Sequence, residues 1–129
     1  LNLVQEIYLQ WSGIGDHGAV TISRALKRQS SLRVADLQHC RIGNKGVEAL
    51  AEALQINRSL ADLILGDNEV GCEGAAAFAY SLRINTTLQN LNLQRNFVED
   101  SGAAQLGRCL AMNHTLATLN LARNRIEDT

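Results

Sequence analysis

Aliphatic side chains recur along the chain at a fixed interval of 28 residues. One column of this pattern consists of Leu9, Leu37, Leu65, Leu93 and Leu121. A second column consists of Val4, Leu32, Leu60, Leu88 and Leu116, and a third of Ile14, Ile42, Val70, Val98 and Ile126. Because these columns stay aligned over the whole chain, they predict an internal repeat, which takes precedence over any local assignment of structure.

Each repeat divides into two halves with different periods. In the first half, Leu91 and Leu93 alternate with polar residues, which predicts a short strand with one buried face. In the second half, Ala103, Leu106 and Leu110 recur at spacings of three and four, which predicts a helix with one apolar stripe. A single unit cannot bury its own apolar surface, so the repeats are expected to stack on one another.

Polar residues flank the expected helices. The residues just before these helices are Asp16, Asn44, Cys72 and Asp100. A side-chain oxygen at this position can cap free backbone N–H groups of its helix, and the cysteine is a weaker cap. The residues that follow the helices are Asn57, Asn85 and Asn113. Asparagine tolerates left-handed backbone, so a left-handed turn is expected to end each helix.

These residues resemble the leucine-rich repeat of the ribonuclease-inhibitor type, in which LxxLxL is followed by Asn or Cys, a glycine-rich turn and an Ala/Leu helix. The resemblance covers essentially all 129 residues. It implies an α/β right-handed solenoid, a horseshoe with a parallel sheet on its concave side and helices on its convex side. It also implies that one residue per repeat turns inward to hydrogen-bond loop backbone, in the column Ser12, Cys40, Asn68, Asn96 and Asn124.

The domain prediction is a single array of about four and a half repeats. Its expected repeats are 1–30, 31–58, 59–86, 87–114 and 115–129. The chain starts inside a repeat and stops at Thr129, where a helix is expected to begin. We therefore interpret it as a fragment of a longer array.

Composition narrows the classes of partner. The chain is 46% hydrophobic but only 4% aromatic, which suits thin stacked layers of aliphatic side chains. A net charge of -1 gives no electrostatic attraction to nucleic acid or to an anionic membrane. No apolar run approaches the ~20 residues that a membrane-spanning helix needs. Neither nucleic acid nor membrane is therefore an expected partner.

Motifs that suggest chemistry have structural explanations. Three N-x-S/T sites begin at Asn57, Asn85 and Asn113, and because they share one repeat position, the repeat itself accounts for them. The three cysteines form no CxxC pair, which favours structural thiols in a reducing compartment. The three histidines have no ligand spacing either. We expect no enzymatic activity, no cofactor, no metal and a cytoplasmic location, with the cilium or cytoskeleton as the alternative.

Residues that face away from the core vary where the core columns repeat, as expected of a recognition surface. Tyr8 and Trp11 are typical interface anchors at the amino-terminal end, although shielding of that end explains them equally well. The surface then runs from acidic to basic residues. The expected contact residues are Tyr8, Trp11, Asp36, His39, Asp62, Ile64, Asp67, Asn92, Arg95 and Arg123.

The preferred functional hypothesis is a scaffold that binds a protein partner on its concave face and edge loops, as in NOD-like receptors, alone or within a larger assembly. Axonemal dynein-regulatory subunits, which carry similar repeats, are a structural variant of this hypothesis. The resemblance also implies a GTPase activator of the Ran type, for which Arg41, Arg95 and Arg123 are available. A clamp-like inhibitor of a basic enzyme is the third hypothesis. Three carboxylates favour that inhibitor, those of Asp36, Asp62 and Asp67, whereas Arg95 and Arg123 oppose it.

Overall fold

The computed structural model describes residues 3–28 and 30–126 of the chain. Short strands and helices alternate along this part. The strands are β1 (Glu6–Tyr8), β2 (Val34–Asp36), β3 (Asp62–Ile64), β4 (Asn90–Asn92) and β5 (Thr118–Asn120). The helices are α1 (Gly15–Lys27), α2 (Asn44–Leu54), α3 (Cys72–Leu82) and α4 (Asp100–Leu110). The helix expected to begin at Thr129 lies outside the described residues.

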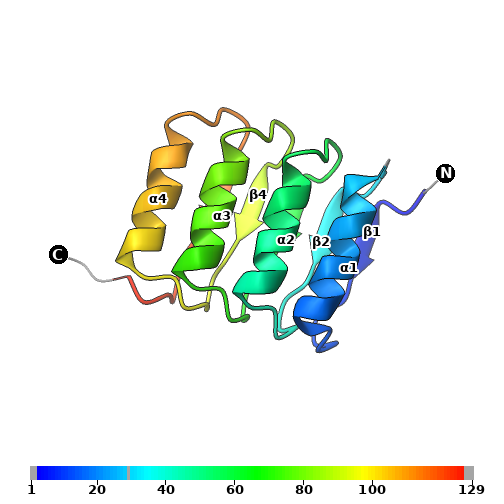
Figure 1. The fold of residues 1–129 in the computed structure, drawn as a ribbon, viewed down its shortest axis with the longest axis horizontal. Helices are drawn as coiled ribbons and strands as arrows, with labels where there is room; N and C mark the ends of the chain where they lie inside the picture. The colour runs from blue at the N-terminus through cyan, green and yellow to red at the C-terminus, as the bar shows by residue number, and fades with distance from the viewer. Residues whose placement is uncertain (1–2, 29, 127–129) are drawn as a thin grey trace.

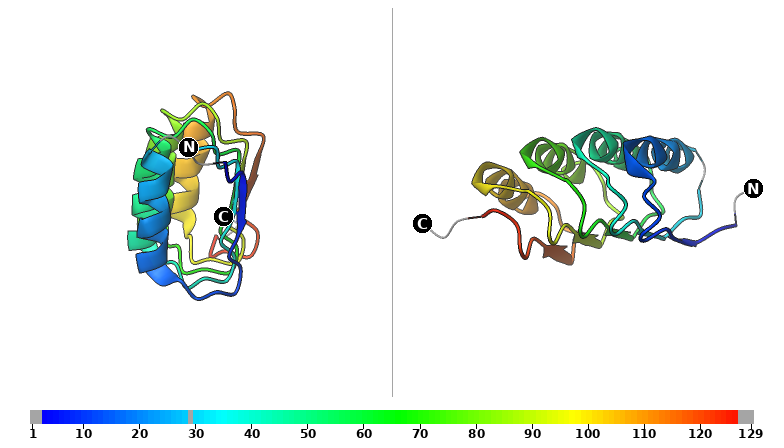
Figure 2. Two further views of the ribbon diagram at one scale, coloured as in Figure 1. Left: turned by 90° about the vertical axis from the view of Figure 1, so that its right-hand side faces the viewer. Right: turned by 90° about the horizontal axis from the view of Figure 1, so that it is seen from below.

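The strands form one parallel sheet in chain order, β1-β2-β3-β4-β5. Each strand residue pairs with the equivalent residue of the next repeat, so that Ile7 pairs with Ala35 and Leu63 with Leu91. The four helices lie side by side in the same order (Figure 1) and form a second layer on one face of the sheet (Figure 2). The chain thus winds once per repeat, which confirms the predicted α/β solenoid.

The aliphatic columns of the repeat form the interior between sheet and helices. In the inner repeats Leu37, Leu65 and Leu93 have an exposed fraction of 0%. Leu9 and Leu121, at the two ends of the same column, are only partly buried. A repeat at an end has a neighbour on one side only, so it buries less of an equivalent side chain. The predicted core register is confirmed in the inner repeats, whereas Val4 and Ile126, at the ends of the second and third columns, are 51% and 41% exposed.

Asn68 turns inward after β3 and bonds loop backbone in two repeats. Its side-chain amide donates to the carbonyl groups of Leu37 and Leu65, at 2.9 and 3.0 Å. Its side-chain oxygen accepts the N–H groups of Cys40 and Ile42, at 3.0 and 2.9 Å. These groups are buried, and unpaired they would be costly. The predicted inward role of this asparagine is confirmed.

The same position is filled in different ways along the array. Asn96 and Asn124 donate to loop carbonyl groups as Asn68 does, and each accepts one loop N–H group at 3.0 Å. In the second repeat, the sulfur of Cys40 donates to the carbonyl of Leu9 at 3.0 Å. Ser12 is shorter, and its hydroxyl lies 3.6 Å from that sulfur. The hydrogen bonds made by the inward side chain therefore weaken toward the amino-terminal end of the array.

The predicted helix caps serve a different helix from the one expected. Asp16 lies inside the first turn of α1, and its carboxylate accepts the N–H groups of Gly43 and Gly46 at 2.6 and 3.1 Å. These are free donors at the start of α2. Asn44 makes the equivalent pair of bonds to the start of α3, at 2.8 and 3.1 Å. The prediction of a cap within the same helix is wrong for Asp16 and Asn44, because each caps the helix of the next repeat.

Asn57, Asn85 and Asn113 connect successive repeats after the helices. The amide of Asn85 donates to the carbonyl of Leu54, and its oxygen accepts the N–H group of Leu88, both at 2.8 Å. None of the three asparagines has a positive φ, so the predicted left-handed turn is wrong. Asn57 and Asn85 are 4% and 3% exposed, which supports the structural explanation of the N-x-S/T sites.

Leu65→Ala is expected to lower the free energy of unfolding by about 2–5 kcal/mol, because the fully buried leucine leaves a cavity. Leu121→Ala is the matched control at the same repeat position. It is expected to cost less, because Leu121 is only partly buried. Urea denaturation followed by circular dichroism compares the two variants. Equal losses would contradict the proposed dependence on stacked neighbours.

Asn68→Ala is expected to destabilise the chain by about 2–4 kcal/mol, because two buried N–H groups lose their acceptor. Asn68→Cys should cost less, since Cys40 already fills this position in the second repeat. The same denaturation measurement ranks the variants. An alanine variant as stable as the parent would show that the inward bonds contribute little.

Candidate functional site

Two sets of side chains lie on the side of the sheet away from the helices. Strand residues alternate between faces, and the outward ones form what we call the sheet face. The sheet face consists of Glu6, Tyr8, Val34, Asp36, Asp62, Ile64, Asn90, Asn92, Thr118 and Asn120. The second set is the residue three positions after each strand, which we call the rim. The rim consists of Trp11, His39, Asp67, Arg95 and Arg123.

Every rim residue has left-handed backbone. The φ values are 67° at Trp11, 52° at His39, 55° at Asp67, 54° at Arg95 and 57° at Arg123. This region costs most residues other than glycine roughly 1–2 kcal/mol. Hydrogen bonds between repeats impose it: the N–H groups of Asp67 and Arg95 donate to carbonyl groups of the next repeat at 3.0 and 2.9 Å. The hydrogen bonds of the repeat therefore hold the same backbone conformation at each rim position.

Neighbouring rim side chains interact in pairs. The rings of Trp11 and His39 are stacked, with centroids 3.7 Å apart and an interplanar angle of 22°. Arg95 forms an ion pair with Asp67 at 3.5 Å. Both charged side chains are partly exposed, so the pair orients them more than it stabilises the fold. The rim therefore presents an aromatic pair at one end and a charged pair farther along.

The amino-terminal end of this surface is open to solvent. Tyr8 is 56% exposed and Trp11 74% exposed. The Tyr8 hydroxyl donates to the Glu6 carboxylate at 2.6 Å. This hydrogen bond is the main reason that the pKa of the Tyr8 phenol is raised, and it keeps the hydroxyl protonated. Two aromatic side chains, one with a polar tip, are thus available for contact.

Asp36 does not lie open on the sheet face as expected. It is only 7% exposed, and its carboxylate accepts the backbone N–H group of Gln38 at 3.2 Å and also its side-chain amide. Asn92 makes the same local turn with Gln94, at 2.9 Å, while staying partly exposed. Asp and Asn commonly bond the backbone two residues on, which ends a strand. Asp36 is therefore a structural residue rather than a contact residue.

A row of polar side chains crosses the middle of the sheet face. Asn90 donates to the Asp62 carboxylate, and the Thr118 hydroxyl donates to Asn90 at 2.5 Å. Val34 and Ile64 lie beside this row in one shallow hollow of about 300 Å³. Asn90 and Thr118 were not among the expected contact residues. Their outward-facing positions on the strands would have been enough to identify them. The centre of the surface thus combines a carboxylate, amides and aliphatic groups.

A further exposed pair lies on the loops after the strands. The Arg125 guanidinium lies 4.5 Å from the centre of the Phe97 ring, and Phe97 is 42% exposed. A cation over an aromatic ring is a favourable contact. The sequence analysis did not identify this pair. The two residues occupy one repeat position, two residues beyond the rim, and that shared position was the available signal.

Reactive chemistry is sparse over residues 3–28 and 30–126. There, no three His, Cys, Asp or Glu side chains are placed to hold a metal ion. The thiols of Cys40, Cys72 and Cys109 are free. A hydrogen bond from Ser101 and one from the N–H group of Glu99 lower the pKa of Cys72.

Among the helices of residues 3–28 and 30–126, none has the length and hydropathy that a membrane span requires.

Comparisons with known proteins agree with this architecture. The chain matches the family described as Leucine Rich repeat over residues 29–51, 57–79, 85–107 and 113–129. No curated protein sequence matches the chain. Among solved structures it is similar to the leiomodin-1 actin-binding site 2 (ABS2), with a TM-score of 0.82 and 22% sequence identity. That similarity covers 91% of this chain and 69% of the other, and at this identity it shows the fold.

Arg95→Gly is expected to be more stable than Arg95→Ala by about 1 kcal/mol, because glycine adopts a φ of 54° without strain. Both variants lose the ion pair with Asp67, so their difference reports the backbone. At Glu48, which is exposed in α2, alanine should instead be the more stable by about 1 kcal/mol. Urea denaturation of the four variants measures both differences. The same order at both sites would contradict strain at the rim.

Proposed function

Because the chain belongs to the leucine-rich repeat family, we propose that it is a protein-binding module whose partner contacts the sheet face and the rim. The observation that carries this proposal is the strained and exposed rim. A frame of repeated hydrogen bonds holds its backbone, while its side chains vary from aromatic through acidic to basic along the array. Stacked helices and strands present these side chains in fixed positions, so little ordering is required on binding.

The amino-terminal half of the surface provides the anchors of the proposed contact. Tyr8 and Trp11 are exposed, and Trp11 is oriented by its stack on His39. Tyrosine and tryptophan are enriched among residues that dominate binding energy. The polar row at Asp62 and Asn90, on β3 and β4, supplies hydrogen-bonding groups farther along the same face. This combination of rigid aromatic anchors and polar neighbours supports a protein partner over a small molecule.

Similarity to a solved structure of the same fold also supports a protein-binding function. The structural neighbour is the actin-binding site 2 of leiomodin-1, so the fold is used there to bind a protein. The repeat length and the full helix in each inner repeat support the ribonuclease-inhibitor subtype. The free thiols support a reducing compartment, and we infer a cytoplasmic protein.

Contacts within the surface weaken the two main alternatives. Arg95, considered for GTPase activation, is engaged by Asp67. An inhibitor of a basic enzyme needs free carboxylates, but Asp36 is buried and Asp62 accepts a hydrogen bond from Asn90. We therefore propose a binding module without enzymatic activity.

Trp11→Ala is expected to weaken partner binding by about 2 kcal/mol or more, which is roughly 30-fold in Kd. The indole is 74% exposed, so its removal should leave folding largely unchanged. Ile56→Ala removes another exposed side chain outside the proposed surface, after the end of α2, and should leave Kd unchanged.

The partner is first captured from cell extract with the unmodified chain and identified by mass spectrometry. Isothermal titration calorimetry of the purified partner then compares the unmodified chain, Trp11→Ala and Ile56→Ala. Unchanged affinity of Trp11→Ala, or an equal loss for Ile56→Ala, would overturn the assignment of the surface.

A further inference from the structure

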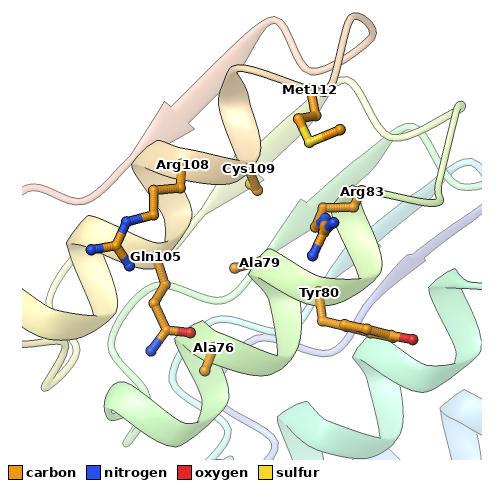
Figure 3. A pocket seen from close by; sticks show the side chains of 8 residues that line it. All are labelled: Ala76, Ala79, Tyr80, Arg83, Gln105, Arg108, Cys109 and Met112. Carbon is orange, nitrogen blue, oxygen red and sulfur yellow. The ribbon is translucent and has the colours of Figure 1, made fainter.

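The helix layer carries a groove that the proposed sheet-face contact does not use. It lies between α3 and α4, which pack side by side. The residues that line it are Ala76, Ala79, Tyr80, Arg83, Gln105, Arg108, Cys109 and Met112. Figure 3 shows Arg108 and Gln105 on one side and Tyr80 and Arg83 on the other, with Ala79 and Cys109 between them.

The floor of the groove is apolar and neutral. Ala76 and Ala79 carry only methyl groups, so a docking element can come close to the helix backbone. Cys109 is buried, and burial raises the pKa of its thiol, so the thiol stays uncharged. Tyr80 and Met112 are 57% and 61% exposed at the edges. Exposed apolar side chains around a concave floor are typical of an interaction site.

The charge of the groove is positive. Arg83 and Arg108 belong to its lining, which contains no aspartate or glutamate. Over residues 3–28 and 30–126, the ion pairs are Lys27 with Glu52 and Arg95 with Asp67. Neither arginine of the groove is therefore paired with a carboxylate.

The equivalent place between α1 and α2 is built differently. There, Lys27 and Glu52 form an ion pair across the two helices at 3.1 Å. The residues that occupy the repeat positions of Lys27 and Glu52 in the α3 and α4 repeats are Arg83 and Arg108. Two cations therefore stand between α3 and α4 where an ion pair joins α1 and α2.

The spacing of the lining residues suits a helical occupant. On or just after α3 they lie at Ala76, Tyr80 and Arg83, and on or just after α4 at Gln105, Arg108 and Met112. Each set spans seven positions, or roughly 10 Å of helix, which is about two turns. Side chains of a third helix at positions i, i+3 or i+4, and i+7 can fill a groove of this length.

We propose that this groove binds an amphipathic helix of a partner protein, with an apolar stripe on the alanine floor and carboxylates facing Arg83 and Arg108. Charge complementarity favours an acidic helix over a basic one, because the groove lining contains two arginines and no carboxylate. The small floor selects a helix with medium-sized apolar residues such as leucine. This site lies in the helix layer, so it is independent of the contact proposed for the sheet face.

The probe for this proposal is a synthetic helix-stapled peptide of about 16 residues, which needs the staple because short helices are marginal in water. Leucines are placed at i, i+3 and i+7, and glutamates flank them. A second peptide has lysine in place of every glutamate. A third peptide has the sequence of the first except for two central prolines, and it carries no staple.

The glutamate peptide is expected to bind the full chain and to shift the amide NMR signals of Ala79, Arg83 and Arg108. The lysine and proline peptides should each bind at least tenfold more weakly by fluorescence anisotropy. Equal binding of the lysine peptide would overturn the charge assignment, and equal binding of the proline peptide would overturn the helical occupant. Shifts centred on another surface would overturn the site.

The double variant Arg83→Glu/Arg108→Glu should lose at least tenfold in affinity for the glutamate peptide. Arg24→Glu/Arg28→Glu is the matched control, because it makes the same change of charge and Arg24 holds the repeat position of Arg108 on α1. An equal loss in the control would show that only overall charge matters. Arg83→Gln/Arg108→Gln repeats the test with a milder change, and Trp11→Ala should leave peptide binding unaltered.

Discussion

Backbone groups that are buried between stacked repeats must find hydrogen-bond partners there, and one inward side chain per repeat supplies them, an asparagine in the third, fourth and fifth repeats. Asn68 satisfies both carbonyl and N–H groups, and its partners belong to two successive repeats. An amide is suited to this task because it donates and accepts at once. The bond therefore fixes the loop and the stacking together. The position of the rim, directly beside this asparagine in the chain, depends on it.

A second set of bonds makes each helix depend on the repeat before it. The oxygens of Asp16 and Asn44 cap the helices of the following repeats, whose own first turns begin after glycine. Asn85 returns from the other end of the repeat to the carbonyl of Leu54. Many polar bonds of a repeat thus cross to a neighbour, so its stability depends on the interfaces between repeats.

The sequence predicts the core well because a leucine column has one physical explanation, a shared interior. It predicts the inward asparagines from residue type and period. The sequence does not predict which backbone groups a polar side chain will bond. Asp16 was assigned to its own helix because local rules consider neighbours in sequence, whereas stacking makes residues about 27–30 positions away equally close. The left-handed rim was also missed, since tryptophan and arginine, which fill three of its five positions, have no preference for that backbone.

The rim shows how the fixed frame and the variable surface fit together. Its φ angle is set by hydrogen bonds between repeats, so a rim side chain is held at the same angle whatever its identity. Glycine would relieve the strain but would offer a partner nothing to contact. A strained large side chain at this position is therefore more consistent with recognition than with stability. The groove between α3 and α4 differs from the rim, because its floor consists of small residues that leave room for an occupant. The two surfaces belong to different layers of the solenoid (Figure 2), so the two proposed contacts share no residue.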